Sequence, residues 1–277
     1  MPHAWTVTPG KKVDLKDYDP GHNGGLDKES AKPLLDALAK EIEELQELMF
    51  AAAKTSLLIV FQARDTGGKD GAINRVLSYL HAQSCRVTSF KAPTPEELRH
   101  DFLWRVHPNT PGRGGIAIFN RSHYEDVIAV RVHKLLPKEV WKPRYDAIND
   151  FEQTLIEADT IVLKFYLHIS KEEQEERLLA READPAKAWK LNVDDWKERD
   201  LWKDTAKAYE DALSRCSTED APWRIVPANH KWFRDLAVAE AIRDALAPHR
   251  KEWEKALAKI GTEAKGELAA YREGKVP

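Results

Sequence analysis

A glycine-rich turn follows an apolar run near residue 60 and carries residue types that bind phosphate. Residues 58–71 read Leu-Ile-Val-Phe-Gln-Ala-Arg-Asp-Thr-Gly-Gly-Lys-Asp-Gly. A strand, a glycine-rich turn and a helix start, in this order, direct backbone N–H groups toward an anion. The turn is close to a Walker A loop, although Ala63 stands where that pattern has glycine. We expect phosphate to be bound by Gly67, Gly68, Lys69, Asp70 and Gly71.

The Walker A pattern is incomplete at the position that normally binds metal. Asp70 follows Lys69, where a serine or threonine hydroxyl usually holds magnesium. A hard divalent cation that is bound together with phosphates needs one or two carboxylates, and Asp65 inside the loop is the candidate. The alternative is an ordinary turn between a strand and a helix, with an exposed lysine.

A second group of polar residues follows the apolar run at 116–119. In P-loop enzymes the end of such a strand carries an acid that binds metal, but here that position is Asn120. We expect Arg121 to neutralise phosphate charge, and Asp126 or Glu125 to hold magnesium or to position the acceptor. The alternative is structural, because Ser122 can cap a helix and acids in a first turn favour the helix dipole.

A third group is basic. Arg177 and Arg181 lie four residues apart on an expected helix, and Lys187 and Lys190 follow in a loop that contains proline. Two arginines on one helix face, followed by lysines in a mobile connection, predict a lid that closes over phosphates and excludes water. The alternative is a solvated helix face, because Glu173 stands four residues before Arg177 at the spacing of a surface ion pair.

Five short apolar segments alternate with helical ones and predict the scaffold that positions these residues. The segments are 56–62, 85–91, 115–119, 160–169 and 223–226. Their alternation predicts an α/β fold with a parallel sheet covered by helices on both faces. Ligands bind at the carboxyl ends of the strands in such sheets, where the polar groups described above lie. Two capping boxes, Thr94 with Glu97 and Ser170 with Glu173, support helices after two of the strands.

The two ends of the chain differ from this alternating core. Apolar residues recur at helical spacing before Lys54 and predict an amphipathic helix through Leu34, Leu38, Ile42, Leu45 and Met49. Residues 249–277 are charged and favour a helix, which predicts a peripheral helix or an interaction tail. We therefore divide the chain into an N-terminal extension (1–54), a P-loop domain (55–248) with a lid near 177–205, and a C-terminal tail (249–277).

Composition excludes several classes of protein. Lys and Arg number 43 and Asp and Glu number 46, so the formal net charge is −3, and general attraction to nucleic acid or anionic lipid is not expected. The apolar runs fall short of the about 20 residues of a membrane-spanning helix, and residues 1–10 lack a signal-peptide pattern. Two cysteines, Cys85 and Cys216, favour a reducing compartment. We expect a cytoplasmic protein with no nucleic-acid or membrane partner.

Three stretches, 62–71, 119–127 and 221–229, resemble the family-2 polyphosphate kinases, and the resemblance extends over about residues 50–246. It implies a thymidylate-kinase-like P-loop fold, in which three α/β/α layers contain a parallel five-stranded sheet and a helical lid. It also implies reversible transfer of the terminal phosphoryl group of inorganic polyphosphate to nucleoside mono- and diphosphates, with Mg2+ or Mn2+. Asn120 with Glu125 is similar to the class III pattern, which implies that AMP is converted through ADP to ATP.

The resemblance further implies roles for individual residues. The catalytic residues would be Asp65, Lys69, Arg121 and Asp126. The metal would be held by Asp65 and Asp126. An adenine or guanine nucleotide would be bound by Asn120, Arg121 and Glu125. Besides the glycine-rich loop, polyphosphate would be bound from the lid by Arg177, Arg181, Lys187 and Lys190. The family also implies a homo-oligomer.

Two other functions are compatible with these residues. An ATP-dependent nucleotide or small-molecule kinase can use the same scaffold, because a fold does not determine the phosphoryl donor. A regulator that binds nucleotide or polyphosphate without turnover is the third hypothesis, since no hydroxyl residue follows Lys69. The pairing of Asp65 with Asp126 argues against it, because a protein that only binds these ligands needs no paired metal ligands. Five tryptophans lie near the expected lid or beyond it, and we assign most of them to packing. Contact with the nucleotide base is the alternative role for any one of Trp189, Trp196, Trp202, Trp223 and Trp232.

Overall fold

The computed structural model describes residues 3–273, apart from the side chains at positions 187, 188 and 190. Within that range one sheet has six strands in the order β1-β6-β5-β2-β4-β3. The strands are β1 (Trp5–Thr6), β2 (Ser56–Ala63), β3 (Cys85–Ser89), β4 (Ile116–Asn120), β5 (Thr160–His168) and β6 (Trp223–Pro227). All pairs are parallel except β1 with β6. The predicted α/β fold and its five parallel strands are confirmed.

The sixth strand corrects the predicted five-stranded sheet. β1 pairs Trp5 with Ile225 and Thr6 with Arg224 in antiparallel register. Two residues are too few to show an alternation of apolar and polar side chains, so no period in the sequence reveals this strand. The central strand β2 is buried along all eight of its residues, as expected of a parallel strand covered on both faces.

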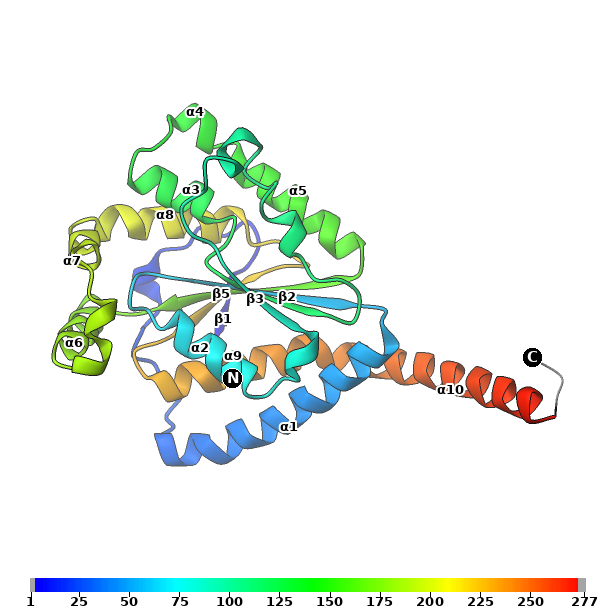
Figure 1. The fold of residues 1–277 in the computed structure, drawn as a ribbon. Helices are drawn as coiled ribbons and strands as arrows, with labels where there is room; N and C mark the ends of the chain where they lie inside the picture. The colour runs from blue at the N-terminus through cyan, green and yellow to red at the C-terminus, as the bar shows by residue number, and fades with distance from the viewer. Residues whose placement is uncertain (1–2, 274–277) are drawn as a thin grey trace.

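Helices cover both faces of the sheet (Figure 1). One face is covered by α1 (Lys28–Ala52), α2 (Lys69–Leu77) and α9 (Lys231–Leu246). The other face is covered by α3 (Glu125–Val132), α5 (Arg144–Glu157) and α8 (Trp202–Arg215). The remaining α-helices are α4 (Lys138–Trp141), α6 (Lys171–Glu182), α7 (Val193–Asp200) and α10 (Arg250–Arg272). Short 3-10 helices span Leu15–Asp17, Ala82–Ser84, Glu97–Arg99, His107–Asn109, Pro185–Lys190 and Ala247–His249.

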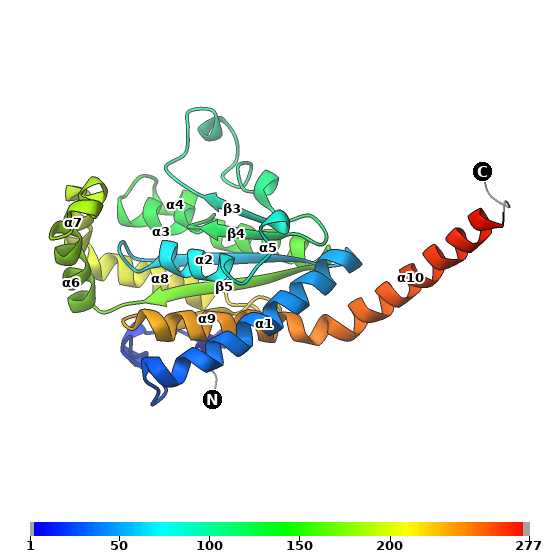
Figure 2. The same cartoon turned by 60° about the horizontal axis from the view of Figure 1, so that its bottom comes forward.

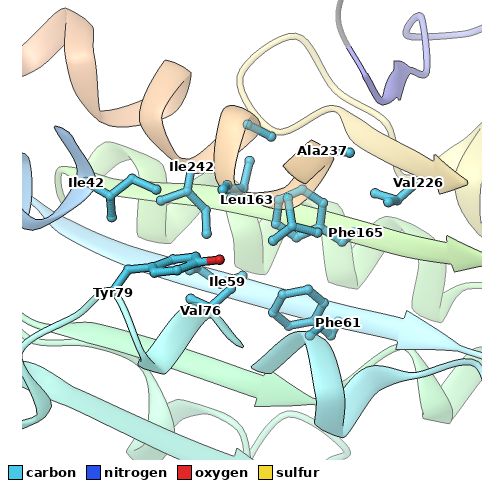
Figure 3. Packing of buried hydrophobic residues seen from close by; sticks show 14 of the residues in the cluster. Ile42, Ile59, Phe61, Val76, Tyr79, Leu163, Phe165, Val226, Ala237 and Ile242 are labelled. Carbon is cyan, nitrogen blue, oxygen red and sulfur yellow. The ribbon is translucent and has the colours of Figure 1, made fainter. Parts of the chain in front are cut away.

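The core between the sheet and α1, α2 and α9 is apolar and closely packed (Figure 3). Phe61 of β2 and Phe165 of β5 stack with their ring centroids 5.2 Å apart. Ile42 of α1 and Ile242 of α9 lie in the same buried cluster. The division of the chain at residues 54 and 248 stays a prediction, and the helices on either side of residue 54 share this core.

The predicted helix before Lys54 is present as α1, with one change in its buried face. Asp27 caps it, and Asp27 and Ser30 exchange side-chain hydrogen bonds with each other's backbone N–H group. Leu34 is 45% exposed, whereas Leu35 is buried. From Leu35 the buried apolar positions continue at Ile42, Leu45 and Met49, which are seven, ten and fourteen residues further along. Leu34 therefore lies about 100° off the stripe that faces the sheet.

The two predicted capping boxes differ in outcome. Thr94 and Glu97 exchange both hydrogen bonds of a capping box, but the turn that follows is only the 3-10 helix Glu97–Arg99. Ser170 accepts the Glu173 N–H at 3.1 Å and caps α6. The Glu173 carboxylate binds Arg177 in place of the backbone, so this box is half formed.

α10 leaves the body of the protein beyond its first turns (Figure 2). Trp253 is fully buried among the α1 and α9 side chains, and its Nε1 donates to Thr55 Oγ1 at 3.0 Å. Ile260, two turns later, is 49% exposed. The prediction of a peripheral helix is confirmed for residues 250–272. Among the described residues, no helix has both the length and the apolar composition needed to cross a membrane.

Because Trp253 attaches α10 to the core, Trp253→Ala is expected to lower the free energy of unfolding by about 3–5 kcal/mol. Urea denaturation followed by circular dichroism measures this change. Ile260→Ala in the same helix is the matched control, and it is expected to change the free energy by less than about 0.5 kcal/mol. Equal losses in the two variants would show that Trp253 does not secure α10.

Candidate active site

The loop between β2 and α2 has the geometry of an anion-binding site. Gly68 adopts φ +93° and immediately precedes α2, which begins at Lys69 as predicted. A Cβ atom at Gly68 would lie 2.4 Å from Arg234 Nη1, so the close approach as well as the backbone conformation requires glycine. Within residues 3–273, the N–H groups of residues 68–71 have no protein acceptor.

The carbonyl groups of this loop are directed into the protein and bind side-chain donors there. Lys69 Nζ donates to the carbonyls of Ala63 (2.9 Å) and Arg64 (3.3 Å). The Gln174 side chain donates to the Asp65 carbonyl at 2.9 Å. Two arginines bind the next carbonyls, Arg177 that of Thr66 and Arg234 that of Gly68, each at 3.1 Å. Since the carbonyls point inward, adjoining amides are turned the other way, where they can bind phosphate.

Lys69 lies inside the loop and its side chain is buried. Burial lowers the pKa of its ammonium group, and the Asp65 carboxylate nearby opposes that shift. In the structure the Lys69 ammonium is bound to carbonyl groups of the loop. Its contact with phosphate stays a prediction.

The second polar group meets the loop at the carboxyl ends of β2 and β4. Arg121 Nη2 donates to Asp65 Oδ1 at 2.8 Å, and the Asn120 amide donates to Asp70 Oδ1 at 2.8 Å. Burial lowers the pKa of the Arg121 guanidinium, but the carboxylates of Glu125 and Asp65 outweigh burial, so that its pKa is raised. Burial raises the pKa of Glu125, and Arg121 and Lys69 only partly offset this. The two predicted groups therefore form one site.

Asp126 lies elsewhere than the sequence suggested. Its Oδ2 accepts from Arg105 Nη2 at 3.2 Å and its Oδ1 accepts from Arg144 Nη1 at 3.2 Å. Burial raises the pKa of Asp126, and the two arginines only partly offset this. Adjacent residues of a helix point about 100° apart, so Glu125 and Asp126 face different surroundings. Asp126 meets two arginines, whereas Glu125 lines a cavity with Asp65. Among the described residues, no cluster of three or more His, Cys, Asp or Glu side chains is suited to a metal.

A cavity of about 160 Å3 opens beside the paired Asp65 and Arg121. Asp65, Arg121 and Glu125 are among the charged residues that line it. Its other walls come from α3 and α8, and include Ile128, Ala129, Val132, Thr205 and Tyr209. The His133–Glu198 pair, with Nε2 and Oε1 3.3 Å apart, also lines it.

A larger hollow of about 680 Å3 lies at the opposite end of the sheet, around Thr55 and Thr160. Several of its charges are already paired, as in Lys54 with Glu252 at 3.6 Å and Arg113 with Asp159 at 3.3 Å. It contains none of the predicted site residues. The smaller cavity is therefore the candidate substrate site, because it lies at the carboxyl ends of the strands.

The predicted lid residues are only partly free to act as a lid. The predicted ion pair of Arg177 with Glu173 is present at 2.6 Å, but the Arg177 side chain is 9% exposed, so the face is not solvated. Arg177 Nη2 also binds the Ala228 and Asn229 carbonyls. Arg181 links α6 to α7, because its Nη1 donates to Asp195 Oδ2 at 2.7 Å. The side chains of Lys187 and Lys190 lie outside the described residues.

Several residues that support the loop were missed in the sequence. Arg234 is 3% exposed although it stands between buried apolar residues of α9. A charged residue within such a run was the available signal, because buried charges need specific partners. Gln174 gave no such signal.

Two of the tryptophans considered for base contact have packing roles. The ring of Trp202 lies against the Arg64 guanidinium, 3.8 Å from the ring centroid, and Trp223 is buried in the core.

The chain has clear relatives among known proteins. A family model described as "Polyphosphate kinase 2 (PPK2)" matches residues 25–254. The "AMP/ADP-polyphosphate phosphotransferase" of Meiothermus ruber is 43% identical over 244 residues, which cover 87% of this chain and 91% of the relative. The "ADP-polyphosphate phosphotransferase" of Rhodopseudomonas palustris is 42% identical over 256 residues, covering 87% and 88%. The crystal structure of polyphosphate kinase 2 from Arthrobacter aurescens TC1 has a TM-score of 0.83 and 40% identity, covering 90% and 92%.

Gly68→Ala tests the loop geometry directly. The new Cβ would displace Arg234 from the loop, so we expect the affinity for inorganic tripolyphosphate, measured by calorimetry, to fall by at least about tenfold. Gly25→Ala is the matched control, because Gly25 also has a positive φ (+74°) but no atom near its would-be Cβ. Both variants are expected to lose about 1–2 kcal/mol of stability from the left-handed backbone. Undiminished tripolyphosphate binding by Gly68→Ala would contradict the loop assignment.

Proposed function

The chain belongs to the polyphosphate kinase 2 family, and we propose that it transfers the terminal phosphoryl group of inorganic polyphosphate to AMP and ADP. One observation carries the proposal: inward-directed carbonyls leave the loop amides free beside the bridge between Arg121 and Asp65. The M. ruber relative is named for both AMP and ADP and the R. palustris relative for ADP. The class III resemblance of Asn120 with Glu125 favours both acceptors here.

The residues of the site suit phosphoryl transfer without a covalent intermediate. A terminal phosphate oxygen of the nucleotide attacks the terminal phosphorus of polyphosphate in line. The bond from that phosphorus to the bridging oxygen breaks, and polyphosphate leaves one unit shorter. The loop amides and Lys69 bind the donor, and Arg121 lies between the phosphates of donor and acceptor. Positioning and fixed positive charge are the main sources of catalysis in this reaction class.

Members of such a phosphotransferase family use divalent metal ions, and we propose magnesium or manganese for this chain. A bound ion supplies neutralisation of phosphate charge. The oxygen ligands present suit a hard cation, since phosphates and water complete its coordination. We propose Asp65 as one ligand. Asp126 was the second ligand implied by the resemblance, but the contacts of Glu125 with the Asp65 cavity favour Glu125.

The sequence resemblance underlies three further proposals. Guanine nucleotides are accepted as well as adenine nucleotides, the chain forms a homo-oligomer, and the enzyme acts in the cytoplasm. The lid residues Arg181, Lys187 and Lys190 contribute positive charge to bound polyphosphate. Arg177 acts on polyphosphate through the loop, because its guanidinium binds the Thr66 carbonyl.

Product analysis with polyphosphate and magnesium, AMP or ADP offered separately and ATP omitted, tests the proposed function. ADP and ATP are expected from AMP, and Lys69→Ala is expected to lower kcat by at least about 100-fold because its ammonium orders the loop. Lys32→Ala, at an exposed position of α1, is the control and keeps wild-type rates. If ADP alone reacts, the acceptor assignment is wrong. If only ATP serves as donor, the chain is an ATP-dependent kinase.

We propose that the nucleoside part of the acceptor enters the 160 Å3 cavity. The apolar side chains that line it suit the faces of a base, and Arg121, which also lines it, would bind the phosphate attached to the nucleoside. Ala129→Leu fills the cavity, so the KM for AMP is expected to rise by at least about tenfold while that for polyphosphate changes by less than about twofold. Ala269→Leu, exposed on α10, is the control. An unchanged KM for AMP in initial-rate measurements would place the nucleoside elsewhere.

A further inference from the structure

A fully buried ion pair lies beneath the turn that carries Arg121 and Glu125. Lys164 on β5 is 0% exposed and Glu152 on α5 is 1% exposed. Lys164 Nζ donates to Glu152 Oε2 at 2.5 Å and to the Cys216 carbonyl at 2.6 Å. Removing two charges from water is costly, and an apolar pair of the same volume is often at least as stable. Stability alone therefore does not account for this pair.

The pair is bound to the turn through the two residues that precede Glu125. The Tyr124 hydroxyl donates to Glu152 Oε1 at 2.8 Å and accepts from Lys164 Nζ at 3.1 Å. His123 Nε2 lies 3.2 Å from the same Glu152 oxygen. His123 and Tyr124 are both 0% exposed, so these hydrogen bonds lie in a region of low dielectric constant, which strengthens them.

The turn is also held at the residues on either side of His123 and Tyr124. Ser122 Oγ accepts from Gln62 Nε2 at 3.1 Å, and Asp126 binds Arg105 and Arg144. Arg121 and Glu125 are the members of the turn that line the cavity.

The backbone of the turn needs such anchoring. Arg121 has φ +59°, a conformation that residues with a Cβ atom seldom adopt. A strained backbone of this kind persists only where the surrounding structure enforces it. In this conformation the Arg121 guanidinium reaches Asp65 across the site.

We infer that Glu152 and Lys164 are positioning residues for phosphoryl transfer, because they hold the His123–Tyr124 part of the turn from which Arg121 reaches Asp65. The inference rests on the proposed function. Neither side chain lines the cavity, so both act through the turn. Glu152 is the acceptor on which the network converges, and an amide in its place would turn a donor toward Lys164 or the turn.

The central test replaces the pair by neutral side chains of similar length, E152Q with K164M, so that no buried charge is left unpaired. We expect kcat to fall by about 100-fold, as a small displacement of Arg121 is enough for such a loss. The KM values for AMP and polyphosphate are expected to stay within about threefold. The loss should vanish in an Arg121→Ala background, because a path through Arg121 makes the two effects non-additive.

Two further variants keep the test decisive. Asp211→Asn is the matched control, since Asp211 forms an ion pair with Arg131 between α8 and α3 but does not contact the turn. Its kcat is expected to stay within about twofold of wild type. If E152Q with K164M does not fold, Tyr124→Phe removes only the hydroxyl that links the pair to the turn, and about a tenfold loss of kcat is expected.

The outcomes separate this inference from the proposed function. Turnover by the wild-type protein establishes the function by itself. In an active enzyme, an unchanged kcat in the double variant, or in Tyr124→Phe where the double variant does not fold, overturns the inference. Losses that add in full to that of Arg121→Ala overturn it as well, because a purely structural effect is independent of Arg121.

Discussion

The phosphate-binding loop depends on one constraint: its carbonyl groups must be directed away from the anion and still be hydrogen-bonded. A buried carbonyl without a donor is costly, and one that faces phosphate repels it. The donors are Lys69 within the loop, Gln174 and Arg177 on α6, and Arg234 on α9. The helices that follow β5 and β6 therefore determine which way the amides after β2 point.

The same constraint shows that part of the predicted lid supports the loop. Gln174 and Arg177, in the first two turns of α6, are bound to the loop, so this part of the helix belongs to the support of the site. Arg199 of α7 extends that support, because its Nη1 donates to the Gln174 side chain at 3.2 Å.

The sequence allowed the strands and the position of the glycine-rich loop to be predicted, because each has a local signal. Parallel buried strands are apolar runs, and the loop has glycines at fixed spacing before Lys69. The partners of Asp126 were not predictable, since Arg105 and Arg144 come from elements whose approach is decided by tertiary packing. Arg234 and Gln174 act on a loop more than a hundred residues away, and no local spacing encodes such contacts.

The packing of α1 against α9 and the start of α10 has a consequence for how the chain folds. Helices from the two ends of the sequence lie side by side on one face of the sheet (Figure 1). During synthesis, the apolar face of α1 emerges from the ribosome long before residues 231–253 are available to cover it. Contacts of such high sequence separation slow folding, because the ends of a long loop must first be brought together. Nascent chains therefore expose this face for most of translation.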